Sequence, residues 1–443
     1  MNANRGFRQT EIGLIPVEWE VVMLGNSDVC DVVMGQSPPS ETYNDEGMGL
    51  PFFQGKADFG FRHPVPKIWC TASQRKALPG DILLSVRAPV GDVNIATTQS
   101  CIGRGLAAIR AKSKADSEFL FYSLMKEKDT LDSLGTGATF RAINKDTVLS
   151  FKLSLPPPSE QRAIASVLST IQAAVEAQQK LIATLRELKQ ATMAKLFREG
   201  LRGEPLKVTK IGEVPESWEV VELHDVVDVK SGKRLPKGLA LVDSKSSYPY
   251  IRIVDMKNNS VNLRDIKYLL PEIRQRIQKY IVTSEDVYIS IAGTTGLVGI
   301  VPKVLDGANL TENAARLVIR DETRIGKQYL MYSLASDIGQ AQVKTLTTQT
   351  SQPKLALSRI ETIQIGLPLP DEQRGIAHVL RIVDDRTTDA EKKRDALQAL
   401  FKAMLHQLMT AQLRVTDVDL PELNGEERGS LVIETDSNAT RSA

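Results

Sequence analysis

A crowded group of basic side chains is the strongest chemical signal in this sequence. Lys230, Lys233, Arg234 and Lys237 place four cations within eight residues, in a turn-rich stretch without an acidic residue. Such a group can contact nucleic-acid phosphates, and Arg or Lys can also read the edge of a guanine. The competing interpretation is a solvated basic loop that binds nothing.

Other polar side chains are weaker candidates for DNA contact. The neutral loop around Gln36 and Ser37 could read base edges, because Gln suits adenine. Arg274, Arg276 and Lys279 form a second basic cluster, which is more typical of an exposed helix face. The remaining candidates, each more typical of ordinary surface when taken alone, are Lys56, Arg62, Arg87, Arg104, Arg141, Arg252 and Lys257.

Motifs for catalysis are missing. The proline-rich runs LPPPSE and LPLPDE lack the Asn/Asp-Pro-Pro-aromatic residues of a DNA amino-methyltransferase. Ser231-Gly232-Lys233 resembles the end of a phosphate-binding loop, but Val227 stands where that loop needs glycine. Gly293, Gly296 and Gly299 do not have dinucleotide-binding spacing, and the four histidines give no zinc spacing. The sequence therefore predicts a binding protein with no catalytic residue and no metal site.

Composition excludes several classes of protein. The chain has 443 residues, of which 42% are hydrophobic and 25% charged, so ordinary globular cores are expected. No apolar run approaches the roughly 18–20 residues that cross a bilayer. Cys30, Cys70 and Cys101 are widely spaced and odd in number, which favours free thiols in a reducing compartment. We expect a soluble, cytoplasmic protein without membrane contact.

The chain is an internal repeat. TEIGLIPVEWEVV (10–22) and TKIGEVPESWEVV (209–221) share eight of thirteen positions, and LPPPSEQRAIASVL (155–168) and LPLPDEQRGIAHVL (367–380) share ten of fourteen. The copies agree at their ends and differ in their middles. This pattern indicates one common scaffold that presents two different surfaces.

A long helix follows each proline-rich motif. Ser159 and Asp371 are the expected N-caps, and Gly200 is the expected stop of the first helix. Some 40 residues make a rod of about 60 Å, whose apolar seam needs another helix to cover it. We expect the two rods to pair with each other rather than to fold back on their own modules, with Thr387 and Arg394 interrupting the apolar seam.

These observations predict a domain order and an α+β fold class. The mixed α/β domains are 1–158 and 201–366, the long helices are 159–200 and 367–413, and 414–443 is an acidic tail that we expect to be disordered. The predicted architecture is two tandem domains separated by two helices that pair as an antiparallel coiled coil with pseudo-twofold symmetry.

The openings IPVEWEVV and VPESWEVV, together with the doubled LPxPxEQRxIAxVL motif that leads into each long helix, resemble the specificity subunit of type I restriction–modification systems. The resemblance covers residues 10–413. It implies a non-catalytic DNA-recognition subunit of a system that defends against foreign DNA. It further implies two target-recognition domains on double-stranded DNA, two methyltransferase subunits bound to the paired helices, and restriction subunits that translocate and cut DNA.

The same resemblance assigns cofactors and contact residues. S-adenosylmethionine, ATP and magnesium are expected in the partner subunits and not in this chain. The residues expected in the spacer helices and their partner contacts are Glu160, Gln161, Arg162, Ile164, Leu168, Ile171, Leu185, Glu372, Gln373, Arg374, Ile376, Leu380, Leu397 and Leu400.

Two rival functions stay open at this point. A chain that itself modifies or cuts DNA is disfavoured by the missing motifs. A coiled-coil adaptor without any DNA role is disfavoured by the different middles of the two copies.

Overall fold

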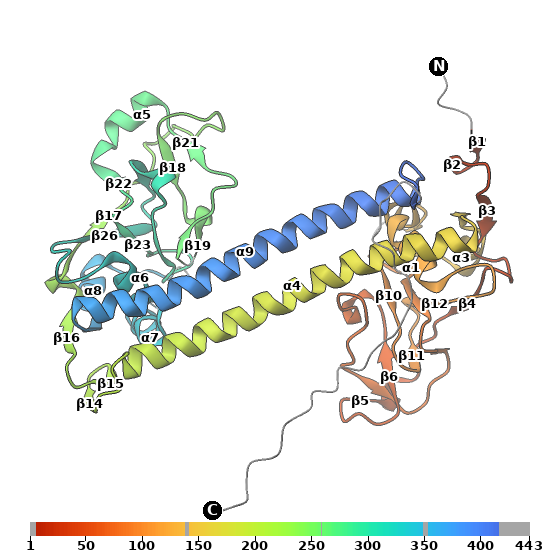
Figure 1. Ribbon diagram of the computed structural model, residues 1–443, viewed down its shortest axis with the longest axis horizontal. Helices are drawn as coiled ribbons and strands as arrows, with labels where there is room; N and C mark the ends of the chain where they lie inside the picture. Colours follow the sequence, from red (N-terminus) through yellow and green to blue (C-terminus); the bar gives the residue numbers. More distant parts are fainter. Residues whose placement is uncertain (1–5, 138–140, 258, 349–352, 416–443) are drawn as a thin grey trace, which may run out of the picture. The chain divides into compact units, whose positions relative to one another are not determined.

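The computed structural model describes residues 6–137, 141–257, 259–348 and 353–415. The chain divides into two compact units (Figure 1). Unit 1 comprises residues 1–177 and 394–443, and unit 2 comprises 178–393. Most of the tail predicted at 414–443 therefore lies outside the described residues, although Arg414 is placed within unit 1.

Unit 1 contains two main sheets. The first is antiparallel and has the order β10-β9-β12-β4, formed by Val93–Ile95, Ile82–Ser85, Leu106–Ala111 and Cys30–Met34. The second has the order β5-β7-β6-β11-β8, formed by Tyr43–Asn44, Trp69–Cys70, Leu50–Phe53, Ser100–Ile102 and Lys76–Ala77. In this sheet β6 and β11 are parallel.

Unit 2 repeats this strand order, with four strands instead of five in its second sheet. Its first sheet, β17-β26-β23-β24, is formed by Val227–Ser231, Ala314–Ile319, Val287–Ser290 and Val298–Ile300. Its second, β21-β18-β25-β22, is formed by Lys267–Tyr268, Pro249–Ile251, Ala308–Leu310 and Ile281–Val282, with β18 and β25 parallel. The middle of unit 2 adds a short hairpin, β19 (Met256–Lys257) with β20 (Ser260–Val261), and helix α5 (Pro271–Arg276).

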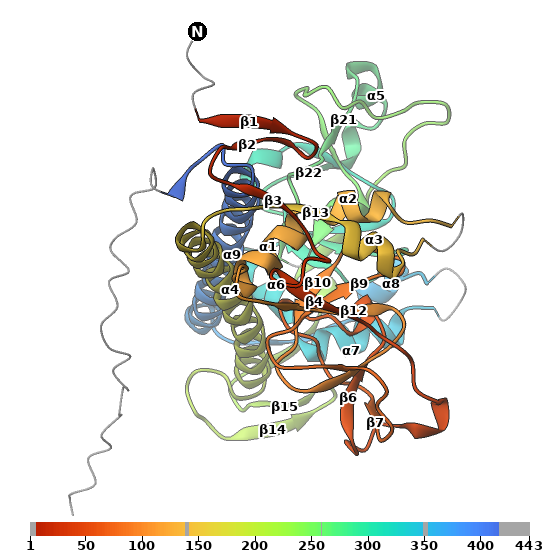
Figure 2. The same cartoon turned by 90° about the vertical axis from the view of Figure 1, so that its right-hand side faces the viewer.

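Within each unit, the strand from the first shared motif pairs with the strand from the second shared motif. Strand β3 (Glu20–Met23) pairs with β13 (Lys152–Leu155) (Figure 2). In unit 2, β16 (Glu219–Glu222) pairs with β27 (Gln364–Leu367). Each pair brings the start of a module beside the strand that leads into its long helix. The two similar ends of each copy therefore form one structural element, which is present in both units.

Shorter elements complete the units. Unit 1 has β1 (Phe7–Thr10), β2 (Gly13–Pro16), η1 (Ser40–Thr42), η2 (Lys56–Asp58), α1 (Ser117–Lys126), α2 (Lys128–Ser133) and α3 (Lys145–Ser150). Unit 2 has β14 (Leu206–Thr209), β15 (Gly212–Pro215), η3 (Leu223–Asp225), η4 (Ile253–Asp255), η5 (Gln278–Tyr280), η6 (Lys303–Leu305), α6 (Lys327–Ala335), α7 (Asp337–Leu346) and α8 (Leu357–Ile360).

The long helices are α4 (Pro158–Glu199) and α9 (Pro370–Met409), and they pack together as predicted (Figure 1). Each begins at a proline, one residue before the expected caps Ser159 and Asp371, because proline is well suited to the first helical position. Gly200 follows α4 with a φ of +64°, so the predicted stop is confirmed.

Both helices contribute to the core of each unit. In unit 1, Ile164 and Leu168 of α4 share a buried cluster with Leu408 and Met409 of α9. In unit 2, the corresponding cluster contains Leu196, Phe197, Ile376 and Leu380. There, Arg186 pairs with Glu391 at 2.6 Å and Lys189 pairs with Asp384 at 2.6 Å, which gives antiparallel order.

The seam departs from its predicted register near the end of α9. Leu400 is 47% exposed and lies outside the seam, whereas Phe401, Met404 and Leu405 pack on the core of unit 1. The expected interruptions make local contacts: Thr387 donates to the Val383 carbonyl, and Arg394 pairs with its neighbour Asp395. Among the described residues, no helix is both long enough and apolar enough to span a bilayer.

Candidate nucleic-acid interface

In unit 1, the polar loop after β4 is anchored by its backbone. The amide of Gly35 donates to the Leu106 carbonyl at 2.9 Å, and the amide of Gln36 donates to the Ile102 carbonyl at 2.9 Å. A Cβ atom on Gly35 would lie 2.1 Å from the Gly103 carbonyl oxygen, so only glycine permits this approach. The anchor leaves the side chain of Gln36 exposed.

In unit 2, the basic loop after β17 has the same anchor. Gly232 donates to the Ala314 carbonyl at 3.0 Å, and Lys233 donates to the Leu310 carbonyl at 2.8 Å. A Cβ atom on Gly232 would lie 1.9 Å from the Thr311 carbonyl oxygen. Because the same strands are joined by the same bonds, Gln36 corresponds to Lys233.

The side chains on this common anchor differ between the units. In unit 1, the Ser37 hydroxyl accepts a 3.3 Å bond from the backbone amide of Arg104, whose side chain is exposed. In unit 2, Nε of Arg234 donates to Oε1 of Glu312 at 2.6 Å. Burial acts to raise the pKa of Glu312, but bonds from Arg234 and nearby groups outweigh it and lower this pKa.

The two basic clusters of unit 2 lie side by side. The ammonium of Lys233 is 5.5 Å from the centre of the Tyr280 ring, and Tyr280 directly follows the exposed Lys279. Leu235 and Leu239 pack against the small core that includes Tyr280 and Ile277. The loop therefore lies beside the α5–η5 segment, on which Arg276 and Lys279 are exposed as expected of a helix face, whereas Arg274 packs over the Tyr248 ring and is partly buried.

Two of the candidate arginines are committed to contacts inside their own unit. Arg62 has a side chain only 17% exposed, which pairs with Glu118 and donates to Gln172 at 2.9 Å. Arg252 pairs with Asp255 at 2.7 Å and Asp265 at 3.1 Å, and these carboxylates raise its pKa. We leave both out of the proposed DNA surface because their guanidinium groups are already used.

The other candidates lie at the surface. Three of them have an acidic neighbour: Lys56 pairs with Asp92 at 2.8 Å, Arg141 with Asp132 at 3.1 Å, and Lys230 with Asp228 at 3.6 Å. The side chains that are simply exposed belong to Arg87, Arg104, Lys237 and Lys257.

The shared Glu-Gln-Arg motif divides into two internal residues and one external residue. Gln161 accepts from the Asp116 amide at 2.7 Å and donates to the carbonyls of Lys114 and Pro156. Gln373 repeats these three bonds, at Gly326, Arg324 and Pro368. Each glutamine therefore ties the first turn of a long helix to the N-cap of a short helix, α1 in unit 1 and α6 in unit 2.

The glutamates of the motif are also used internally. Glu160 accepts from Nε1 of Trp19 at 2.9 Å and pairs with Arg414 at 2.8 Å. Glu372 accepts from the Leu201 amide at 2.8 Å. By contrast, Arg162 and Arg374 are exposed in their respective copies.

The expected apolar residues of the spacer helices range from buried to exposed, with Leu400 exposed as described above. Ile164, Leu168, Ile376 and Leu380 are buried. Those that are only partly buried are Ile171, Leu185 and Leu397.

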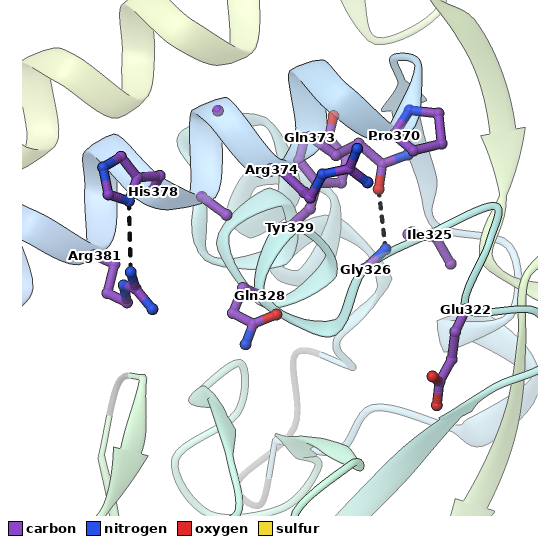
Figure 3. Close-up of a pocket in the computed structure, with 12 residues that line it drawn as sticks. Glu322, Ile325, Gly326, Gln328, Tyr329, Pro370, Gln373, Arg374, His378 and Arg381 are labelled. Carbon is purple, nitrogen blue, oxygen red and sulfur yellow. Dashed lines mark hydrogen bonds between the residues drawn. The ribbon is translucent and has the colours of Figure 1, made fainter.

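A cavity of about 650 Å³ lies beside the exposed arginine of unit 2 (Figure 3). Arg374, His378 and Arg381 line it from successive turns of α9, and Glu322 and Gln328 line it from the segment around the start of α6. A 3.5 Å contact joins the His378 and Arg381 side chains. This hollow is open to solvent, has a lining of mixed polarity, and carries basic side chains on its α9 side.

Within the described ranges, no group of three or more His, Cys, Asp or Glu side chains is arranged to hold a metal ion. The sequence reasoning also missed Glu312, since nothing local marks an acidic residue 78 positions from Arg234 as its partner. The repeat was the signal that could have found it, because Arg104 and Glu312 follow the equivalent strands β11 and β25.

Known proteins are similar to this chain in sequence and in fold. A family model described as the type I restriction modification DNA specificity domain matches residues 16–187 and 215–398. A putative specificity subunit named MjaX, from Methanocaldococcus jannaschii, is 46% identical over 200 residues, which are 45% of this chain and 47% of that protein. The MjaVIII specificity subunit of the same organism is 24% identical over 91% of this chain and 95% of its own length.

The crystal structure of a type I S subunit from M. genitalium has the same fold, with a TM-score of 0.61 at 17% identity, over 88% of this chain and 96% of that one. The chain belongs to the type I restriction–modification DNA specificity family. It is a non-catalytic specificity subunit with two target-recognition domains, and its function is DNA recognition within a type I restriction–modification complex.

Proposed function

We propose that residues 1–158 and 201–366 are the two target-recognition domains and that each reads one half of an asymmetric, gapped site in double-stranded DNA. The observation that carries this proposal is the common loop anchor with different exposed side chains. Gly35 and Gly232 make the same backbone contacts, yet Gln36 and Ser37 follow one, and Lys233 and Arg234 follow the other. A shared support with different readers suits a site with two unlike halves.

The helices 159–200 and 367–413 are proposed to set the gap and to bind two methyltransferase subunits, which restriction subunits then join. The support is the exposed pair Arg162 and Arg374. The Glu and Gln of the motif make hydrogen bonds within each unit, whereas the side chains of these arginines are exposed in both copies, with Arg374 paired to Asp371 on the same helix. The cavity beside Arg374, which is basic on its α9 side, offers a hollow that a partner side chain can enter.

The cofactors are proposed to reside in the partners. S-adenosylmethionine belongs to the methyltransferase subunits, and ATP with magnesium belongs to the restriction subunits. The support in this chain is the family to which it belongs.

Co-expression with the neighbouring methyltransferase subunit in a host without adenine methylation tests the main proposal. Genome-wide mapping of methylated adenines is expected to give a two-part motif with a fixed gap. An ungapped motif would contradict the division of reading between two domains. Absence of methylation in an assembled complex would contradict DNA reading itself.

Changing the length of one helix tests the role of the helices. Insertion or deletion of a helical turn near Ala183 or Asp395 is expected to change the gap and leave both half-sites intact. An unchanged gap in an active variant would refute it. As the matched control, exchanging residues 10–155 for those of another family member is expected to change one half-site only.

A further inference from the structure

We propose that Arg234, oriented by Glu312, is a specificity-determining residue that reads a guanine in the half-site of unit 2. This inference rests on the proposed function above. It names which of the basic side chains on this surface reads a base rather than a phosphate.

The backbone before Arg234 is fixed from three directions. The amide of Lys233 donates to Leu310, and the carbonyl of Lys233 accepts from the Tyr250 hydroxyl at 2.8 Å. The tight approach of Gly232 to the Thr311 carbonyl prevents the loop from moving inward. After Arg234, Leu235 and Leu239 pack into the small core around Tyr250 and Ile273. A reader needs such a rigid base, because base contacts tolerate little displacement.

Glu312 orients the side chain of Arg234 and leaves most of it exposed. Glu312 accepts from its Nε atom at 2.6 Å, while the side chain stays 78% exposed. With Nε engaged and the side chain largely exposed, the edge formed by the two terminal nitrogens is available to a base. Two parallel N–H groups match O6 and N7 of guanine, the commonest specific contact in the major groove.

The neighbouring cations have different geometry. The ammonium of Lys233 leans over the Tyr280 ring, which directs it away from this position. In unit 1, the equivalent pair is Ser37 and Arg104, joined only through the Arg104 amide. Unit 1 has no arginine held by an acid at this place among its described residues, so its half-site is not expected to carry the same guanine.

The test uses this chain assembled with its methyltransferase partner, and it maps methylated sites for a set of variants. R234A is expected to lose discrimination at one position of one half-site by about tenfold or more. R234K keeps the positive charge but lacks the two-pronged group, so it is expected to behave like R234A. E312A is expected to relax the same position, whereas E312Q keeps an acceptor for Nε and is expected to restore most of the discrimination.

K237A is the matched control, since it removes an exposed cation from the same loop. It is expected to lower methylation evenly and to leave both half-sites unchanged. Full discrimination in R234A, or full rescue by R234K, would overturn the inference. Failure of the wild type to give any two-part motif would instead refute the proposed function. The exposed side chain predicts unchanged thermal midpoints, and R234K provides the test if R234A fails to assemble.

Discussion

In each unit a short helix is hydrogen-bonded to a long helix, α1 to α4 in unit 1 and α6 to α9 in unit 2. The acceptor on the long helix is neutral in unit 1 and charged in unit 2. The Tyr122 hydroxyl donates to Oε1 of Gln172 at 2.7 Å, and the Tyr332 hydroxyl donates to a carboxylate oxygen of Asp384 at 2.6 Å. Both tyrosines belong to the repeated Tyr-Ser-Leu sequence. Both units thus have a tyrosine hydroxyl that donates to the long helix, and they differ in the charge of the acceptor.

Each unit balances its acceptor with a different cation. In unit 1, Arg62 bonds to Gln172 and is neutralised by Glu118. In unit 2, Lys189 of α4 pairs with Asp384 at 2.6 Å and lies 5.3 Å from the Tyr332 ring centre. Asn259, from the β19–β20 hairpin, adds a 2.9 Å bond to the same carboxylate. Asp384 of α9 therefore contacts α4, α6 and the β19–β20 hairpin, whereas Gln172 of α4 contacts Tyr122 of α1 and Arg62.

The largest expected difference between the units comes from removing these acceptors. D384A leaves a lysine, a hydroxyl and an amide without their partner, so we expect it to destabilise unit 2 by about 3 kcal/mol. Q172A removes a neutral acceptor and is expected to cost about 1 kcal/mol. Denaturant unfolding of the full chain, with hydrogen exchange to locate the loss, measures both. Equal losses would show that the charge of Asp384 is irrelevant.

Alkaline pH separates the contribution of the Tyr122 hydroxyl. Burial raises the pKa of Tyr122 to about 12, although Arg62 acts in the opposite direction. Because the folded state holds this proton more tightly, its stabilising effect is full below pH 10 and is lost as pH rises to 12. The free energy of unfolding of the wild type, relative to that of Y122F, is expected to fall by about 2 kcal/mol over this interval. A constant difference from pH 9 to pH 12 would contradict this assignment.

The smallest expected difference concerns the two buried tryptophans. Nε1 of Trp19 donates to Glu160, whereas Nε1 of Trp218 is buried without a hydrogen-bond partner among the described residues. W19F should therefore cost about 1 kcal/mol more than W218F, because only W19F breaks a hydrogen bond to a charged group. Thermal unfolding of both variants tests this, and a larger loss in W218F would reverse the comparison.

Much of the fold could be predicted from the sequence because its signals are local. The repeated motifs, the prolines and the three-to-four-residue spacing of Ile164 and Leu168 define two long helices without knowledge of their partners. The register near Leu400 could not be predicted, since Leu400 and Phe401 are both apolar and either continues the spacing. Packing against Tyr122, at 6.0 Å between ring centres, selects Phe401.

The site was less predictable because its contacts join distant segments. Arg62 and Arg234 look alike as arginines in loops, but Glu118 and Gln172 draw one inward, and Glu312 holds the other at the surface. Their roles depend on residues 56 to 110 positions away along the chain. Only the topology brings those residues together.

The glycine anchors have a consequence for how such a protein can evolve. Gly35 and Gly232 are held by backbone atoms alone, and the side chains that follow them project from an unchanged support. Substitutions at Gln36, Ser37, Lys233 or Arg234 therefore alter what the loop presents with little effect on folding free energy. On the proposed function, sequence preference depends on these side chains and folding depends on the backbone anchor, so a lineage can change the DNA it recognises while the domain stays folded.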